Sequence, residues 1–253
     1  MNPEGCWFES NPGSFLERIV IARRFRGPQS SANGGYTCGR IAALLDADAV
    51  EVTLRLPPPL ETPLEVERTG DGVRMLDGDV LVAEARPAEL ELDLPEPVPF
   101  ADAERLAAAR PDDPDHPFPG CFTCGPARAE GDGLRLRPAP TGDGRVVAPW
   151  RPLEVSPELV WAALDCPGAF AVNVDWGRGV SVLGRLTARI LALPAPGEEC
   201  VVVAWPLGGE GRRLHAGTAL FRAGEPLAYA RAVWFLVENS ARDADTLAQV
   251  NVQ

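Results

Sequence analysis

Two segments of the chain have apolar residues at a helical period, but on too many sides for a helix on the surface. The first lies within residues 30–47, SSANGGYTCGRIAALLDA, where a glycine turn precedes the run IAALL. We expect a helix over residues 35–47, buried by a sheet that wraps around it. At its start, Gly34 and Gly35 either present free backbone N–H groups that hold a carbonyl oxygen or an anion, or only shape a tight loop.

The second buried helix has a strong start signal. Ser156 suits the N-cap, Pro157 the first helical position and Glu158 the first turn. The run LVWAALD that follows is again too apolar for a surface helix. We therefore expect a central helix from Pro157 to Asp165 and onward, which Pro167 and Gly168 kink or end.

Strand-like runs accompany both helices, and their short length and turn residues indicate antiparallel meanders. Those around the first helix cover residues 16–25, 50–56, 64–67, 72–76 and 80–85. Those around the second cover residues 134–137, 145–150, 181–193, 199–206, 212–222 and 226–237. The pattern predicts an α+β fold with two antiparallel sheets, each wrapped around one central helix, which is the double hotdog arrangement.

The order of elements divides the chain into two similar units. We expect a leader over residues 1–13, a first unit over 14–94, a proline-rich linker over 95–119, a second unit over 120–238 and a tail over 239–253. The linker contains one short helix, residues 102–110, with Asp102 as a plausible N-cap. AALLDA in the first unit corresponds to AALDC in the second, and DGDVLVAEAR corresponds to AGEPLAYAR, so internal duplication is the simplest account.

Composition excludes some functions. The net charge of −12 over 253 residues argues against general nucleic-acid binding, because no basic surplus exists to neutralise phosphates. No apolar stretch is long enough to span a bilayer, and the N-terminus lacks the pattern of a signal peptide, so we expect a cytoplasmic protein with no membrane partner. Its six cysteines are then free thiols rather than a disulfide framework. The sequence leaves a homo-oligomer open.

Three motifs resemble a known family. NGGY at residues 33–36 resembles the helix start of double-hotdog acyl-CoA thioesterases, and the chain as a whole resembles that family. CFTCGPARAEGDGL at 121–134 resembles the opening CFxCGxxNPxGL of many single hotdog thioesterases, and HAGTALFRAGEPLAYARAVWFLV at 215–237 resembles their final hairpin. The resemblance covers nearly the whole chain from residue 14 to residue 237. It implies two fused hotdog units whose sheets join, active sites at the seam between units, and hydrolysis of acyl-CoA or acyl-carrier thioesters. Some relatives dehydrate or isomerise instead, and some have lost activity.

The two halves of the chain depart from the family pattern at different positions, and each half keeps what the other has lost. Ser-Pro-Glu stands at residues 156–158, where single hotdog thioesterases often have His-Gly-Gly, whereas the acid in the middle of the helix survives as Asp165. In the first half the glycines survive, but the acid position falls near Ala42. Each half keeps a different part of the machinery, which favours one composite site per chain and leaves degeneration into a non-enzyme open.

Asp165 is the strongest candidate for a catalytic residue. It follows an apolar helical run, where a carboxylate at the end of the helix opposes the helix dipole by about 0.3–1 kcal/mol, and a locally unfavourable acid suggests a functional reason. The resemblance implies that such an acid attacks the thioester or activates water. The N–H groups of Gly34 and Gly35 would then stabilise the oxyanion. The alternative is an acid that faces solvent. Asp46 is the corresponding acid of the first half. It is followed by Ala47 and Asp48, as at an ordinary helix C-terminus, so we expect no catalytic role for it.

Other residues complete the expected site. Asn33 either caps the first helix or orients water, with capping favoured, and we place Tyr36 beside it in the substrate site. Coenzyme A is anionic, so an acidic protein needs a local basic patch, for which Arg212 and Arg213 are candidates. Each of them could instead belong to an ordinary solvated strand.

We expect no cofactor and no bound metal. Cys121 and Cys124 form a CxxC, but a structural zinc site needs two further ligands, no second CxxC exists, and the nearest histidine is His116. Cys166 could be a nucleophile, but no histidine is near it in sequence. The sequence therefore indicates a thioester hydrolase acting on acyl-CoA or acyl-carrier substrates. A non-catalytic protein that binds acyl groups or small hydrophobes, and a hotdog dehydratase or cyclase, remain the alternatives.

Overall fold

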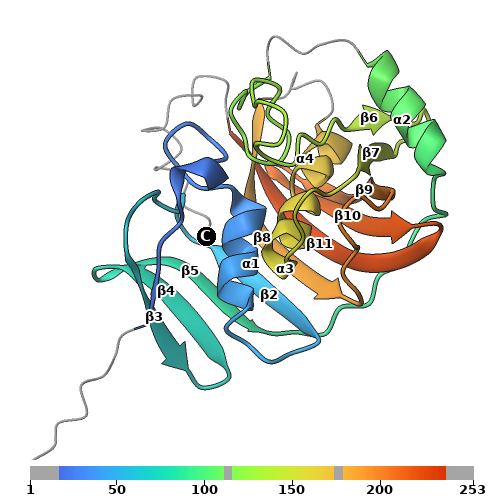
Figure 1. Cartoon of the computed structure of the whole chain (residues 1–253). Helices are drawn as coiled ribbons and strands as arrows, with labels where there is room; N and C mark the ends of the chain where they lie inside the picture. Colours follow the sequence, from blue (N-terminus) through green and yellow to red (C-terminus); the bar gives the residue numbers. More distant parts are fainter. Residues whose placement is uncertain (1–16, 111–115, 174–178, 238–253) are drawn as a thin grey trace, which may run out of the picture.

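A computed structural model describes residues 17–110, 116–173 and 179–237, and its described strands form one antiparallel sheet (Figure 1). The sheet has eleven strands in the order β1-β3-β4-β5-β2-β8-β11-β10-β9-β7-β6. Those of the first half are β1 (Arg18–Ile19), β2 (Ala49–Leu54), β3 (Leu64–Thr69), β4 (Gly72–Asp77) and β5 (Val80–Pro87). Those of the second half are β6 (Ala139–Pro140), β7 (Val146–Trp150), β8 (Val180–Ile190), β9 (Cys200–Glu210), β10 (Arg213–Arg222) and β11 (Glu225–Val237).

The two halves meet where β2 pairs with β8. This pairing corrects the expectation of two sheets, and it agrees with the joining of the sheets that the family resemblance implied. Val52 of β2 lies opposite Leu186 of β8, and both side chains are fully buried. Without this pairing, each half would end in an edge strand with unpaired N–H and C=O groups. Joining the edges satisfies these groups and makes the core continuous from one half to the other.

Within the described residues, three buried helices pack on one face of the sheet, and a fourth helix covers part of the other face. Helix α1 (Gly34–Ala42) contacts β2, β5 and β8, whereas α4 (Cys166–Val172) contacts β9 and β10, and α3 (Pro157–Ala163) lies against α1 (Figure 1). Helix α2 (Phe100–Ala109) covers the opposite face at β7 and β9. The alternation of side chains along these strands separates the faces: Val202 belongs to the large core around the central helices, and Val203 to the cluster under α2.

The helix expected from Pro157 onward is in fact two helices. It breaks at residues 164–165, before the predicted kink at Pro167, and α4 begins at Cys166. Pro167 explains the position of the break. A proline has no N–H for an i−4 carbonyl and its ring clashes there, but it fits the first turn of a new helix. Helix α1 also differs from its prediction, because it ends at Ala42 and residues 43–45 form a turn.

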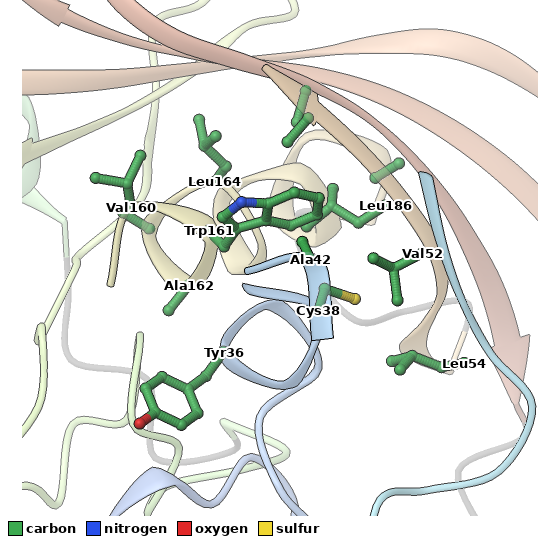
Figure 2. Packing of buried hydrophobic residues seen from close by; sticks show 14 of the residues in the cluster. Tyr36, Cys38, Ala42, Val52, Leu54, Val160, Trp161, Ala162, Leu164 and Leu186 are labelled. Atoms are coloured by element: carbon green, nitrogen blue, oxygen red, sulfur yellow. The ribbon is translucent and has the colours of Figure 1, made fainter. Parts of the chain in front are cut away.

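Glycines let α1 and α3 approach closely. A Cβ atom on Gly39 would lie 2.7 Å from the Cα of Glu158, and one on Gly35 would lie 2.7 Å from the carbonyl oxygen of Trp161. Both distances are below any ordinary contact, so these two positions, one helical turn apart, require glycine. Figure 2 shows the apolar cluster formed around this contact, with Trp161, Ala162 and Leu164 in the α3 region, Cys38 and Ala42 on α1, and Val52, Leu54 and Leu186 on the sheet.

Several local predictions need correction. Of the strand predicted over residues 16–25, the structure describes residues 17–25, and these contain only the short β1 and a 3₁₀ turn, Arg23–Phe25. Residues 134–137 form no strand, because the backbone turns at Arg135, whose φ is 49°. Helix α2 begins at Phe100, so Asp102 lies in its first turn and Pro99 takes the N-cap position.

The expected leader (1–13) and tail (239–253) lie outside the described residues. In the described part of the chain, no helix has the length and apolar character needed to cross a membrane.

Candidate active site

Asp165 lies buried between the two halves of the molecule, in the break between α3 and α4. Only 3% of its surface is exposed. Its Oδ2 accepts a hydrogen bond from the backbone N–H of Gly35, at 2.9 Å, and another from Nδ2 of Asn33, at 3.0 Å. The acid of the second half is therefore held by the start of the central helix of the first half.

Asn33 has two roles at once. Its Oδ1 accepts the N–H of Tyr36 at 2.8 Å, which caps α1, while its Nδ2 donates to Asp165. The side chain is almost fully buried, and the backbone donor at Tyr36 dictates which end of the amide carries the oxygen. The cap was expected from the sequence, whereas the bond to the acid depends on the packing of the two halves.

The N–H of Gly35 already has a hydrogen-bond acceptor within the protein. It is therefore not free to stabilise an oxyanion, which was its expected role. It donates to Asp165, and a Cβ atom on Gly35 would lie 2.5 Å from the Cβ of that acid. The helix-dipole argument for Asp165 also needs correction. Its carboxylate lies at the N-terminus of α1, and the residue itself takes the N-cap position of α4. These two helix ends favour the negative charge and offset the C-terminus of α3, which opposes it.

The surroundings of Asp165 make its carboxyl group unusual. Burial raises its pKa to about 7, although the hydrogen bonds from Gly35 and Asn33 favour the charged form. Its second oxygen, Oδ1, is buried and has no hydrogen-bond partner among the described residues. An acid with one oxygen fixed and the other unpaired can take up or give a proton without losing its position.

A cavity of about 100 Å³ lies beside this acid. Its wall is mostly apolar and comes from both halves, with a few polar groups beside Asp165. The apolar lining includes Leu54, Leu56, Phe118, Ala169, Phe170, Val182, Leu183 and Trp234, and the polar lining includes Ser31, Asn33, His116 and Ser181. Such a cavity suits an apolar group whose one polar end meets the acid.

Three residues expected at the site do not line the cavity. The ring of Tyr36 stacks on that of Phe25, with centroids 3.8 Å apart, and packs into the core. Arg212 and Arg213 lie exposed at the start of β10, where the guanidinium of Arg213 sits over the ring of Phe235. Gly34, in contrast, does line the cavity.

A cluster of three thiols also borders the cavity, and the sequence indicated only two of them as a pair. The Sγ atoms of Cys121, Cys124 and Cys166 all lie within 4.8 Å of one another, and those of Cys121 and Cys166 are 3.7 Å apart. Hydrogen bonds from Cys124 and Cys166 lower the pKa of Cys121, whereas the pKa of Cys166 is raised because its thiol donates to Cys121. The only signal in the sequence was that Cys166 follows Asp165.

Comparison with known proteins identifies the fold. No protein-family model matches the chain, and no curated protein matches it in sequence. Solved structures do match. A conserved protein of unknown function with a hot dog fold from Alicyclobacillus acidocaldarius has a TM-score of 0.59 at 16% identity, over 87% of this chain and 92% of that one.

Two mycobacterial structures are similar to the same extent. The acyl-CoA thioesterase II TesB2 from Mycobacterium marinum has a TM-score of 0.57 at 14% identity, over 88% of this chain and 93% of that chain. The tesB protein from Mycobacterium avium subs paratuberculosis also has a TM-score of 0.57, at 16% identity, over 88% of this chain and 96% of that one. At this level of identity the match concerns the fold, and the predicted hotdog architecture is confirmed.

Proposed function

We propose that this protein hydrolyses acyl thioesters and that Asp165 is its catalytic acid–base group. One observation carries the proposal: a buried carboxylate at the junction of the two halves, oriented by Asn33 and Gly35, borders an apolar cavity. An apolar acyl group fits such a cavity, and the thioester carbonyl is its polar end. The thioesterase names of the mycobacterial structures with the same fold support this reaction class.

The geometry of Asp165 favours a role as general base. Its Oδ2 is held by two donors, so Oδ1 is the oxygen that accepts a proton from water as the water attacks the carbonyl carbon. The resulting tetrahedral intermediate expels the thiolate, which takes the proton back from Asp165. The products are a carboxylic acid and a thiol, and the carboxylate of Asp165 is regenerated for the next cycle.

The developing oxyanion needs a donor other than Gly35. The N–H of Gly34 occupies the first helical position of α1, where it has no partner within the helix, and Gly34 lines the cavity. We assign the oxyanion to this N–H. We infer an acyl carrier, either coenzyme A or a protein, from the reaction class alone. Arg212 and Arg213 do not line the cavity, so they give no support for either carrier.

A second function has one observation in its favour. Because Asp165 occupies the N–H of Gly35, one of the two expected oxyanion donors is engaged, as in a protein that binds an acyl group without hydrolysing it. The two functions differ in turnover. A non-catalytic binder would hold an acyl thioester at the same affinity whether residue 165 is an acid or an amide.

The test is a panel of acyl-CoA substrates of increasing chain length, with released coenzyme A measured by chromatography, because the protein's own thiols react with thiol reagents. Asp165→Asn should lower kcat by roughly 10²–10⁴ with KM little changed, as expected for loss of a general base. Asp46→Asn is the matched control, because Asp46 is an exposed acid after α1.

Equal rates for wild type and Asp165→Asn, at equal thermal stability, would exclude the catalytic assignment. Binding of acyl-CoA without turnover by either protein would favour the second function.

A further inference from the structure

The three thiols beside the cavity have the spacing of a metal site. Zinc binds thiolate sulfur at about 2.3 Å in a tetrahedral arrangement, so two sulfur ligands lie about 3.8 Å apart. The Sγ atoms of Cys121 and Cys166 are 3.7 Å apart, and the Sγ of Cys124 lies within 4.8 Å of both. Closing this triangle around an ion needs only small side-chain rotations.

The loop that carries the first two cysteines is built to present sulfur. The backbone N–H groups of Thr123 and Cys124 donate to the sulfur of Cys121, and the N–H of Gly125 donates to the carbonyl of Cys121 at 2.9 Å. A Cβ atom on residue 125 would lie 2.5 Å from the backbone of Cys121, so this tight turn requires glycine. Backbone donors aimed at a sulfur stabilise the thiolate form that a metal needs.

The third cysteine is fixed against this loop independently of any ion. The hydroxyl of Thr123, which lies between Cys121 and Cys124, donates to the carbonyl of Ala162 at the end of α3, at 3.1 Å. The hydroxyl of Thr218 on β10 donates to the carbonyl of Leu164, at 2.9 Å. These bonds anchor the loop and the α3–α4 break to each other and to the sheet, and Cys166 follows that break directly.

We propose that Cys121, Cys124 and Cys166 bind one zinc ion as three thiolates, with water in the fourth position on the cavity side. Binding displaces the protons that the thiols still carry and gives a site of net charge −1, one zinc dication with three thiolates. Soft sulfur ligands in a tetrahedral arrangement favour zinc over magnesium or calcium, which prefer oxygen. An open fourth position is typical of zinc sites that face a cavity.

This proposal contradicts the expectation from the sequence that the protein binds no metal. That expectation counted ligands close to the CxxC in the chain, and Cys166 comes from beyond α3. The zinc site borders the same cavity as Asp165. Its test is nevertheless separate from that of the proposed hydrolysis, because Asp165 is not among the ligands and metal content is measured without any substrate.

The experiment uses the full-length protein, reduced, stripped with a chelator, desalted and titrated with zinc alone against a chromophoric chelator. Wild type should bind about one zinc per chain by elemental analysis. Each of Cys121→Ser, Cys124→Ser and Cys166→Ser should weaken zinc binding by about 100-fold or more, because each removes one ligand of three. Cys200→Ala is the matched control, since Cys200 is a buried thiol on β9 outside the cluster.

A second measurement on wild type does not depend on the folding of the variants. Cobalt in place of zinc should give thiolate-to-metal charge-transfer absorption and the visible bands of a tetrahedral site. Zinc should also slow the alkylation of Cys121, Cys124 and Cys166, mapped by mass spectrometry, and should leave the alkylation of the buried Cys200 unchanged.

Folded, reduced wild type that takes up no zinc would overturn the proposal. Zinc binding that survives Cys166→Ser unchanged would do so as well, as would a disulfide among the three cysteines in protein purified without an oxidant.

Discussion

The central helices of the two halves solve the same packing problem in different ways. Helix α1 in the first half is continuous, starts at a glycine pair and approaches its neighbour through Gly35 and Gly39. The corresponding segment of the second half starts at a regular Ser156 cap and then breaks in two at Asp165. One helix offers small residues and backbone donors, and the other offers a buried acid.

The difference teaches how a site can be divided between the two halves of one chain. An acid in the interior needs donors, and Asp165 has no side-chain donor from its own half in the bonds to Oδ2. Both donors come from Asn33 and Gly35 at the start of α1. The site therefore exists only while the β2–β8 pairing and the α1–α3 contact hold the halves together, so perturbing either helix should affect both.

The largest expected effect on stability comes from removing the main apolar side chain of the α1–α3 contact. Trp161 is 4% exposed and belongs to the continuous core. Trp161→Ala should lower the free energy of unfolding by about 3–5 kcal/mol, because it leaves a cavity that the helices cannot fill. Denaturant unfolding measures the loss, with Leu153→Ala, at an exposed site, as the control near zero. A loss below about 1 kcal/mol would show that the contact carries little of the stability.

The next effect separates the two roles of Asn33. Asn33→Ala removes the cap of α1 and a donor to a carboxyl group, and should destabilise the protein by about 2–4 kcal/mol. Both variants should also lower turnover, because the acid loses the donor that orients it. Asn33→Ser keeps a capping oxygen but not the donor to Asp165, so it should recover about 1 kcal/mol of the lost stability while turnover stays low. If Asn33→Ser restores both stability and turnover, the bond to Asp165 has no role in orienting the acid.

A smaller effect tests the close approach at the start of α1. Gly35→Ala should cost about 1–3 kcal/mol, because its Cβ would meet fixed backbone and Asp165, and it should lower turnover by displacing the acid. Gly34→Ala should cost less, because its Cβ meets mainly the side chains of Leu183 and Leu54, which can move. Thermal melts of the two variants side by side measure this, and equal shifts would contradict the difference between the two glycines.

The smallest effect concerns the cap of the other helix. Ser156 Oγ accepts the N–H of Leu159 at 3.4 Å and has no contact with the acid. Ser156→Ala should therefore cost about 1 kcal/mol and leave turnover unchanged. A loss of turnover in this variant at equal folding would mean that the start of α3 also orients the site, and would weaken the contrast between the two caps.

Much of the secondary structure was predictable because the signals were local. The alternating runs of β2 to β5 and β7 to β11 were recognised within a few residues of their ends, and the Ser156 N-cap and Asn33 cap were read from residue type. The errors fell where local preference met another constraint. The residue types at 134–137 favour a strand. In the structure, however, the N–H groups of Leu134 and Leu136 donate to the carbonyls of Phe122 and Thr123, which belong to the CxxC loop and not to a neighbouring strand.

The sequence by itself determined that the central helices are buried, that Asn33 caps the first of them, and that Asp165 is out of place among apolar neighbours. These are properties of residue type and period, which depend on near neighbours in the chain. The family resemblance implied that the sheets join. Only the tertiary structure decided that they join through β2 and β8, that the N–H of Gly35 donates to Asp165, and that Cys166 meets the CxxC. Each of these is a contact between residues about 40 or more positions apart, and no local pattern specifies which distant partner satisfies a buried polar group.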